Sequence, residues 1–115
     1  MIIDFVIVNH VLEHVDDEKA IKELSRILAP KGILLLTVPE IASWEKTYEI
    51  DRKLTEKEKE LHYGQYDHLR YYGGDFIARI NSFSEIKHLS TFIASGEDVI
   101  KFGLNRGEKY YVFKK

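Results

Sequence analysis

Two histidines, His14 and His68, are the side chains that we single out for acid–base chemistry. An imidazole changes its protonation near neutral pH, so it can accept a proton from a reacting group. The alternative for His14 is a hydrogen bond to the backbone in a loop, and the alternative for His68 is a solvated loop position beside Asp67. We take both histidines as candidate catalytic bases.

A zinc-binding pattern surrounds the first of these histidines. Residues 10–14 read His-Val-Leu-Glu-His, which is the H-x-x-E-H pattern of one class of zinc proteases. On a helix, His10 and His14 would share a face and could both bind zinc, with Glu13 or the distant His68 as a further ligand. The segment directly follows a buried-type strand, however, and 115 residues are few for that protease fold. We therefore predict no metal site, keep a zinc hydrolase as the weaker alternative, and assign Glu13 a structural role.

The elements that position these residues begin with a strand, a helix and a second strand. Residues 2–8, from Ile2 to Val8, are nearly all apolar and predict a strand that is covered on both faces of a parallel sheet. An acidic helix start at residues 16–18 leads into an amphipathic helix that Pro30 and Gly32 are expected to end. Residues 33–38 form the second buried-type strand, so a βαβ unit is predicted.

The second half of the chain predicts shorter elements. Ile41, Trp44 and Tyr48 are spaced like one face of a helix, and Thr55 with Glu58 forms a capping box for a short helix. Four further elements are expected: a helix over residues 75–83, a strand over 86–93, a helical turn over 97–102 and a last strand over 110–113.

Composition excludes several classes of protein. The chain is 44% hydrophobic and 31% charged, which fits one soluble domain over residues 1–115. Its net charge of −2 gives no basic field for nucleic acid, and the absence of cysteine excludes disulfides and thiolate metal sites. No apolar run approaches the roughly 20 residues of a membrane span, and the N-terminus is a poor signal peptide. We expect a cytoplasmic protein without nucleic-acid or membrane partners.

Four segments in order resemble one enzyme family. Residues 4–15 read DFVIVNHVLEHV and residues 28–39 read LAPKGILLLTVP; residues 63–70 read YGQYDHLR and residues 74–80 read GDFIARI. Together they resemble the C-terminal half of S-adenosylmethionine-dependent methyltransferases of the Rossmann-like class, close to the type 11 small-molecule enzymes. The first two segments correspond to the fourth strand, the following helix and the fifth strand of that fold.

This resemblance implies a partial α/β Rossmann-like sheet. The family orders its strands 3-2-1-4-5-7-6, and this chain would supply 4-5-7-6. No G-x-G-x-G segment is present to hold the methionine end of the cofactor. By resemblance, Asn9 and His10 follow strand four and line that end of S-adenosylmethionine. We expect methyl transfer to a small-molecule acceptor, by a chain that is incomplete or inactive alone and binds the cofactor weakly or not at all.

The implied strand order also predicts a partner. Strand four would lose its neighbour and become an open edge, which invites pairing with another chain. We expect residues 2–8 to pair in a homodimer about a two-fold axis, or with a separate chain that bears the N-terminal half. The alternative function is a non-catalytic oligomeric binding or scaffold module, or one subunit of a split methyltransferase.

Arg70 and a group of aromatic residues carry weaker signals. A guanidinium can hold an anionic substrate group, but we favour a surface arginine paired with Asp67. The aromatic residues could line an acceptor pocket or serve only as packing. They are Trp44, Tyr48, Tyr63, Tyr66, Tyr71 and Tyr72.

Overall fold

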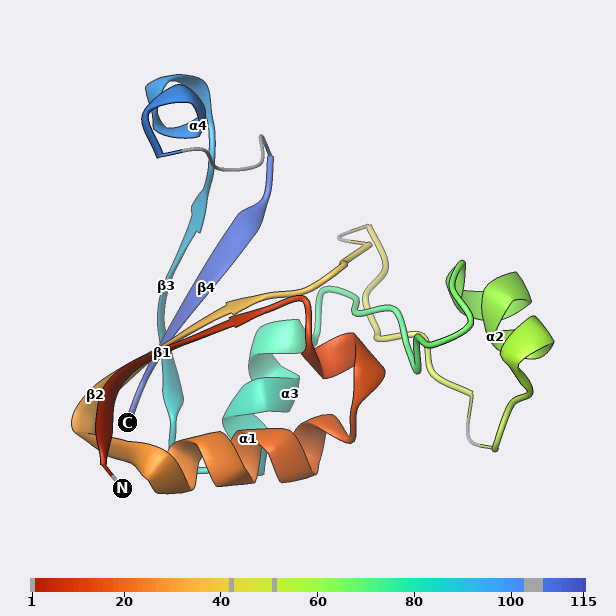
Figure 1. The fold of residues 1–115 in the computed structure, drawn as a ribbon, viewed down its shortest axis with the longest axis horizontal. Coiled ribbons are helices and arrows are strands. Elements are labelled where there is room, and N and C mark those ends of the chain that lie inside the picture. The colour runs from red at the N-terminus through yellow and green to blue at the C-terminus, as the bar shows by residue number, and fades with distance from the viewer. Residues whose placement is uncertain (1, 42, 51, 103–106) are drawn as a thin grey trace.

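The computed structural model of the chain describes residues 2–41, 43–50, 52–102 and 107–115 (Figure 1). Its elements in order are β1 (Ile3–Asn9), a 3₁₀ turn η1 (Leu12–His14), α1 (Asp17–Ile27), β2 (Leu28–Thr37), α2 (Glu56–Tyr63), α3 (Phe76–Phe83), β3 (Lys87–Ile93), α4 (Gly96–Phe102) and β4 (Lys109–Lys114). Across these described ranges, no helix is both long and apolar enough to span a membrane.

The four strands form one sheet in the order β1-β2-β4-β3. β1 and β2 run parallel because α1 carries the chain back between them, whereas β4 is antiparallel to both of its neighbours. When β1, β2, β3 and β4 are numbered as the family's strands four, five, six and seven, the observed order is the predicted 4-5-7-6. The predicted partial α/β sheet is confirmed, with β1 at one edge.

Helix α1 begins as predicted and ends earlier than predicted. Asp16 caps it by accepting a hydrogen bond from the Lys19 backbone N–H at 3.2 Å. The helix stops at Ile27 because Leu28 is already extended and pairs with β1. Pro30 and Gly32 therefore lie within β2, and a side chain at Gly32 would stand 2.7 Å from the Ala29 carbonyl oxygen.

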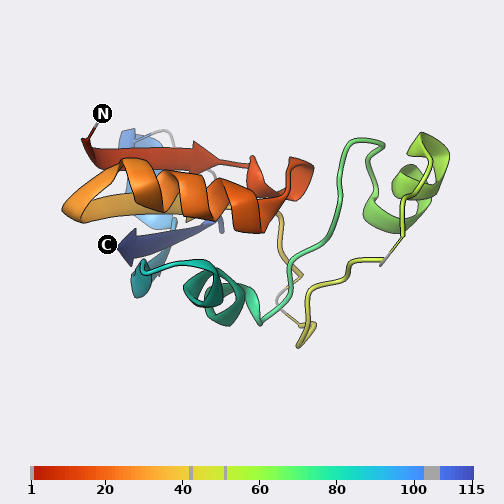
Figure 2. The same ribbon diagram turned by 90° about the horizontal axis from the view of Figure 1, so that it is seen from below.

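Helices α1 and α3 cover the same face of the sheet (Figure 2). Ile21 of α1 and Ile80 of α3 are fully buried against Leu34 and Leu36 of β2. The core cluster consists of Val8, Leu12, Ile21, Leu28, Leu34, Leu36, Val38, Tyr72, Phe76, Ile80, Ile86, Tyr111 and Phe113.

The opposite face of β1 is open. Side chains alternate across a strand, so Val8 points to the helices while Phe5 and Ile7 point away from them. Phe5 is 53% exposed and Ile7 is 60% exposed. The prediction that residues 2–8 are covered on both faces is therefore wrong for the part of the chain that the structure describes, because α1 and α3 both pack on one side.

The segment between β2 and α3 leaves the sheet and carries α2 outward (Figure 1). The described residues around Trp44 form no helix, in contrast to the spacing of the apolar residues there. Tyr48 instead makes an antiparallel bridge to Tyr71, and Glu40 makes a parallel bridge to Tyr72. Helix α2 is confirmed with its capping box, and it ends at Gly64, whose φ of 78° suits glycine.

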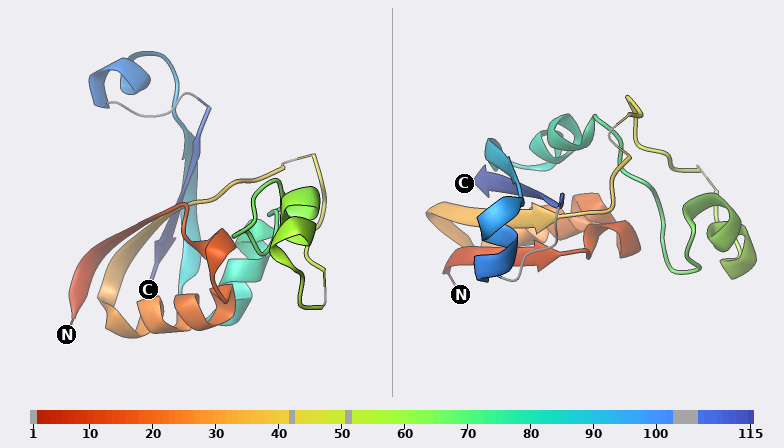
Figure 3. Two further views of the ribbon diagram at one scale, coloured as in Figure 1. Left: turned by 45° about the vertical axis from the view of Figure 1, so that its right-hand side comes forward. Right: turned by 90° about the horizontal axis from the view of Figure 1, so that it is seen from above.

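Helix α4 lies apart from the other helices. It joins β3 to β4 at the far end of those two strands, away from α1 and α3 (Figure 3). The predicted helical turn over residues 97–102 and the two strands beside it are confirmed.

Candidate functional site

The carboxyl ends of β1 and β2 meet through polar contacts. The hydroxyl of Thr37, the last residue of β2, donates a hydrogen bond to Oδ1 of Asn9. The backbone N–H of His10 donates to the carbonyl oxygen of Thr37 at 3.0 Å and is 3.2 Å from its Oγ1. His10 has a φ of 54°, so the chain turns sharply where β1 ends. Asn9 and His10 thus stand at the carboxyl end of β1, as expected.

The ring of His10 points toward the start of β4. Its Nε2 lies 2.7 Å from Oε1 of Glu108, and because a carboxylate only accepts, this nitrogen carries the hydrogen. Its Nδ1 lies 3.7 Å from Oε2 of Glu13. A hollow of about 290 Å³ lies here, lined by His10, Glu40, Glu108 and Lys109 among others.

His14 and His68 come together although they are far apart in the sequence. Their rings meet edge to face with centroids 4.6 Å apart. His14 Nδ1 lies 3.1 Å from the carbonyl oxygen of Asp67 and 3.3 Å from its Oδ2. Nδ1 therefore donates a hydrogen, and Nε2 keeps its lone pair. The backbone hydrogen bond proposed as the alternative for His14 is present, and the ring remains beside His68.

His68 is buried, with only 6% of its surface exposed, so the alternative of a solvated loop position is wrong. Its Nδ1 has no hydrogen-bond partner among the described residues, and the same holds for Oε1 of Glu13. Burial lowers the pKa of His68, and the neighbouring His14 lowers it further, against the opposing charges of Glu13 and Asp67. The lowered pKa makes His68 harder to protonate than an imidazole in water.

The helical geometry suggested by H-x-x-E-H is absent from this segment. Only Leu12–His14 is helical, as a 3₁₀ turn, and His10 lies before it in the left-handed region. His10 and His14 therefore do not share a helix face, because His10 turns toward Glu108. The zinc-hydrolase alternative depended on such a shared helix face, which this segment lacks.

A family model described as a methyltransferase domain matches residues 2–83. This chain belongs to the methyltransferase domain family. The match includes β1, α1 and β2, and with them Asn9, His10, His14 and His68. No curated protein sequence matches the chain.

The fold of this methyltransferase domain is also found in a solved structure. An S-adenosylmethionine-dependent methyltransferase from Mesorhizobium loti superposes with a TM-score of 0.60 at 10% identity. The match covers 97% of this chain and 61% of the other, so the chain spans less than two thirds of that protein's length. At this identity the likeness concerns the fold alone.

In this methyltransferase domain Arg70 is a buried structural residue. It is 4% exposed, and its Nη1 donates to the carbonyl oxygens of Leu12 and Val15 at 2.5 and 2.8 Å. Its Nε donates to Glu49 at 2.8 Å. The expectation of a surface arginine paired with Asp67 is therefore wrong, because Arg70 holds η1 against the segment that carries α2.

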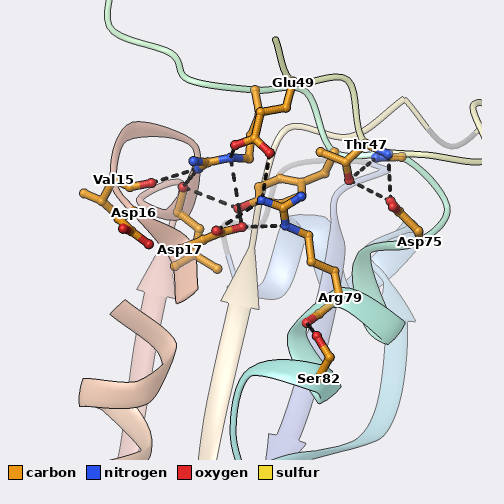
Figure 4. A network of polar contacts seen from close by, with 12 residues as sticks. Val15, Asp16, Asp17, Thr47, Glu49, Asp75, Arg79 and Ser82 are labelled. Atoms are coloured by element: carbon orange, nitrogen blue, oxygen red, sulfur yellow. Dashed lines mark hydrogen bonds and ion pairs between the residues drawn. The ribbon is translucent and has the colours of Figure 1, made fainter. Parts of the chain in front are cut away.

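Asp17 anchors the same segment from α1 (Figure 4). It accepts hydrogen bonds from Arg79 Nε at 2.8 Å and from the Tyr72 hydroxyl at 2.7 Å. Arg79 also donates to Glu49 at 3.1 Å. Burial alone would raise the pKa of Asp17, but the hydrogen bonds from Arg79 and Tyr72 and the charge of Arg70 lower it. These contacts join α1 and α3 to the outer segment.

The aromatic residues mainly pack against one another. Tyr48 meets Trp44 and Tyr63 edge to face with centroids 5.8 Å apart in each case. Tyr72 is fully buried in the core, whereas Tyr66 is 54% exposed. These contacts are those of packing, which was one of the two roles expected.

Sequence reasoning missed two acidic residues of the site, Glu40 and Glu108. Glu40 accepts a hydrogen bond from the hydroxyl of Tyr111 and lies 3.4 Å from Lys109 Nζ. Burial and the bond to Glu40 raise the pKa of Tyr111. The strand order 4-5-7-6 could have predicted their position, because it brings the start of the last strand to the carboxyl end of strand five.

Proposed function

We propose that this domain takes part in transferring a methyl group from S-adenosylmethionine to a small-molecule acceptor. The observation that carries the proposal is that Asn9 and His10 lie at the carboxyl edge of a sheet with the family's strand order. Open α/β sheets bind their ligands at this edge, near the point where the strand order reverses. Family membership supports the same reaction class.

In this proposal Asn9 and His10 face the methionine end of the cofactor. Thr37 fixes the side chain of Asn9, and Glu108 fixes the ring of His10, so both are positioned before a ligand arrives. The sequence contains no glycine-rich loop for the remainder of the cofactor. Binding by this chain alone is therefore weak, and a complete pocket needs residues from outside it.

His14 and His68 are the candidate proton acceptors in this proposal. Methyl transfer depends mainly on alignment of the acceptor with the sulfonium methyl group. A base is needed only when the acceptor must lose a proton. In this proposal His14 accepts the proton through the lone pair on Nε2, while the lowered pKa of His68 makes that ring the weaker acceptor.

The edge of β1 is the proposed site of a partner strand. Among the strands that the structure describes, β1 pairs with β2 alone, and Ile7 and Phe5 beside the open edge are exposed. A second copy, joined antiparallel about a two-fold axis, or a separate chain that bears the N-terminal half of the fold would cover this edge. The same open edge favours the second candidate function, a non-catalytic oligomeric binding module or subunit.

Calorimetry with S-adenosylmethionine tests the proposal, with the mass of the protein in solution recorded on the same sample. Micromolar binding by a dimer would support a cofactor site that is rebuilt across an interface. An Asn9→Ala variant should then bind at least several-fold more weakly, whereas an Asn81→Ala variant on α3 should not. An absence of heat at every protein concentration would contradict cofactor binding by this chain and favour the binding module.

A further inference from the structure

Three side chains that can bind a metal lie close together near the carboxyl end of β1. Glu13, His14 and His68 each offer one ligand atom, and these atoms lie within 4.8 Å of one another. Two imidazole nitrogens and one carboxylate oxygen form a set that binds divalent transition metals. Zinc sites with three protein ligands leave a fourth position for water or substrate.

Two polar atoms of this cluster lack partners. Oε1 of Glu13 and Nδ1 of His68 have no hydrogen bond within the described part of the chain, and the two residues are 1% and 6% exposed. Buried polar atoms are nearly always satisfied by protein, water or an ion, and a buried carboxylate without full compensation is costly. A cation bound in this cluster would satisfy both groups.

The outer contacts of His14 fit the same conclusion. An imidazole that ligates a metal nearly always donates its other N–H to a carbonyl or carboxylate oxygen, which fixes the tautomer. His14 Nδ1 makes such contacts with the carbonyl oxygen and Oδ2 of Asp67. The nitrogen left with a lone pair is Nε2, and it lies 3.8 Å from Oε2 of Glu13.

We propose that Glu13, His14 and His68 bind a divalent transition-metal ion, with Zn²⁺ as the ion that best suits this ligand set. Ligand atoms of a tetrahedral zinc site lie about 3.4 Å apart, so the three side chains must approach by roughly an ångström. This differs from the expectation of no metal, which considered a helical pair of His10 and His14. His68 takes the place of His10 because the loop at residues 65–70 is bound to η1, with the Leu69 N–H donating to the Glu13 carbonyl oxygen at 2.7 Å.

The ion would also restrict which methyl acceptors the site can use, and this consequence rests on the proposed function. The cluster adjoins the proposed cofactor residues, since His10 Nδ1 is 3.7 Å from Glu13 Oε2. A hydroxyl bound to a divalent ion gives up its proton to solvent more readily. Its oxygen then forms the bond to the methyl carbon while the carbon–sulfur bond breaks, and sulfur keeps the electron pair as a neutral thioether. The site therefore favours a hydroxyl acceptor and removes the need for His14 or His68 to take the proton.

Titration of the metal-free chain with Zn²⁺, in the absence of S-adenosylmethionine, tests the site. We expect one ion per chain, and at least about tenfold weaker binding in the His14→Ala and His68→Ala variants. The matched control is His88→Ala on β3, whose ring bonds to Thr91 outside the cluster. That variant should bind as the unaltered chain does.

Circular dichroism checks that each variant folds. Should His68→Ala unfold, His68→Gln replaces it, and the visible absorption of Co²⁺ bound to the unaltered chain reports tetrahedral ligation without any variant. An absence of binding, or equal weakening by His88→Ala and His68→Ala, would overturn the site. Zinc binding without any response to S-adenosylmethionine would support the metal site and count against the proposed function. Binding of S-adenosylmethionine by a chain that binds no zinc would support the proposed function and overturn the metal site.

Discussion

The carboxylate of Asp17 connects parts of the chain that are distant in sequence. It lies in the first turn of α1, where a negative charge is favourable, and it accepts hydrogen bonds from Arg79 and Tyr72. The side chains of Asp17 and Arg70 are each 5% exposed, so little water is available beside Arg70 to replace this carboxylate. Asp17 therefore holds α1 to Arg79 of α3 and to the segment that contains Tyr72.

Replacement of Asp17 by asparagine should lower the free energy of unfolding by about 2–3 kcal/mol, because it removes the carboxylate bound to Arg79 and one of the two carboxylates beside Arg70. Chemical denaturation measures the change. Asp16→Asn is the matched control, since asparagine caps a helix as well as aspartate does and Asp16 is exposed. That control should stay within about 0.5 kcal/mol of the unaltered chain. Equal loss in both variants would contradict the role of Asp17.

The stability difference between the unaltered chain and Asp17→Asn should depend on pH. The pKa of Asp17 is lowered from its ordinary value of 3.8 in the folded chain. A lowered pKa means that the contribution is fully present above about pH 4 and is lost as the pH falls through the folded-state value. Denaturation at a series of pH values should show the two curves converging below about pH 4. A difference that does not change with acid would contradict the ion pairs.

The residue types indicated the histidines of the site but did not indicate that Arg70 is buried. His14 and His68 were identified because an imidazole suits proton transfer, and their proximity is observed in the fold. Arg70 was expected at the surface, because charged residues are usually exposed and nothing local shows otherwise. Its partners Leu12, Val15 and Glu49 come from two other segments, so only the tertiary arrangement reveals its burial.

Strand β1 is the element on which the proposed assembly depends. An Ile7→Lys substitution places a charge beside its open edge, where Ile7 is 60% exposed. Charged residues at an edge oppose pairing with another strand. We expect the unaltered chain to associate and the Ile7→Lys variant to have the mass of a monomer in light scattering.

The control for this variant is Leu61→Lys on α2, where the leucine is 82% exposed and far from β1. It should associate as the unaltered chain does. An unaltered chain that is monomeric, with the amide protons of residues 3–9 exchanging freely, would contradict the paired edge.

Elements with strong local signals were predicted well. The capping box at Thr55 and the acidic start of α1 located two helices, since these signals depend on neighbours within one turn. The helix-like spacing of Ile41, Trp44 and Tyr48 does not correspond to a helix among the described residues there, because Glu40 and Tyr48 pair with Tyr72 and Tyr71, which lie far along the chain. Helical spacing of three apolar residues could not reveal this pairing.

Across the whole molecule, the strand order determines which residues meet. β4 runs antiparallel to β2 with Tyr111 opposite Leu36, so the residues before β4 lie at the carboxyl edge beside His10. The resemblance predicted the order 4-5-7-6 and hence the location of this edge. It did not predict that Glu108 would bond to His10, because side-chain contacts across 98 positions depend on the exact register of the sheet.

We propose that S-adenosylmethionine binds at the carboxyl edge of β1 and β2. The most direct test is a titration of the isotope-labelled chain with S-adenosylmethionine, followed by the backbone amide shifts in nuclear magnetic resonance, which detects weak binding. We predict progressive shifts of the amides of Asn9, His10 and Thr37, with α2 and α4 unaffected. An absence of shifts, or shifts confined to α2 or α4, would contradict the claim.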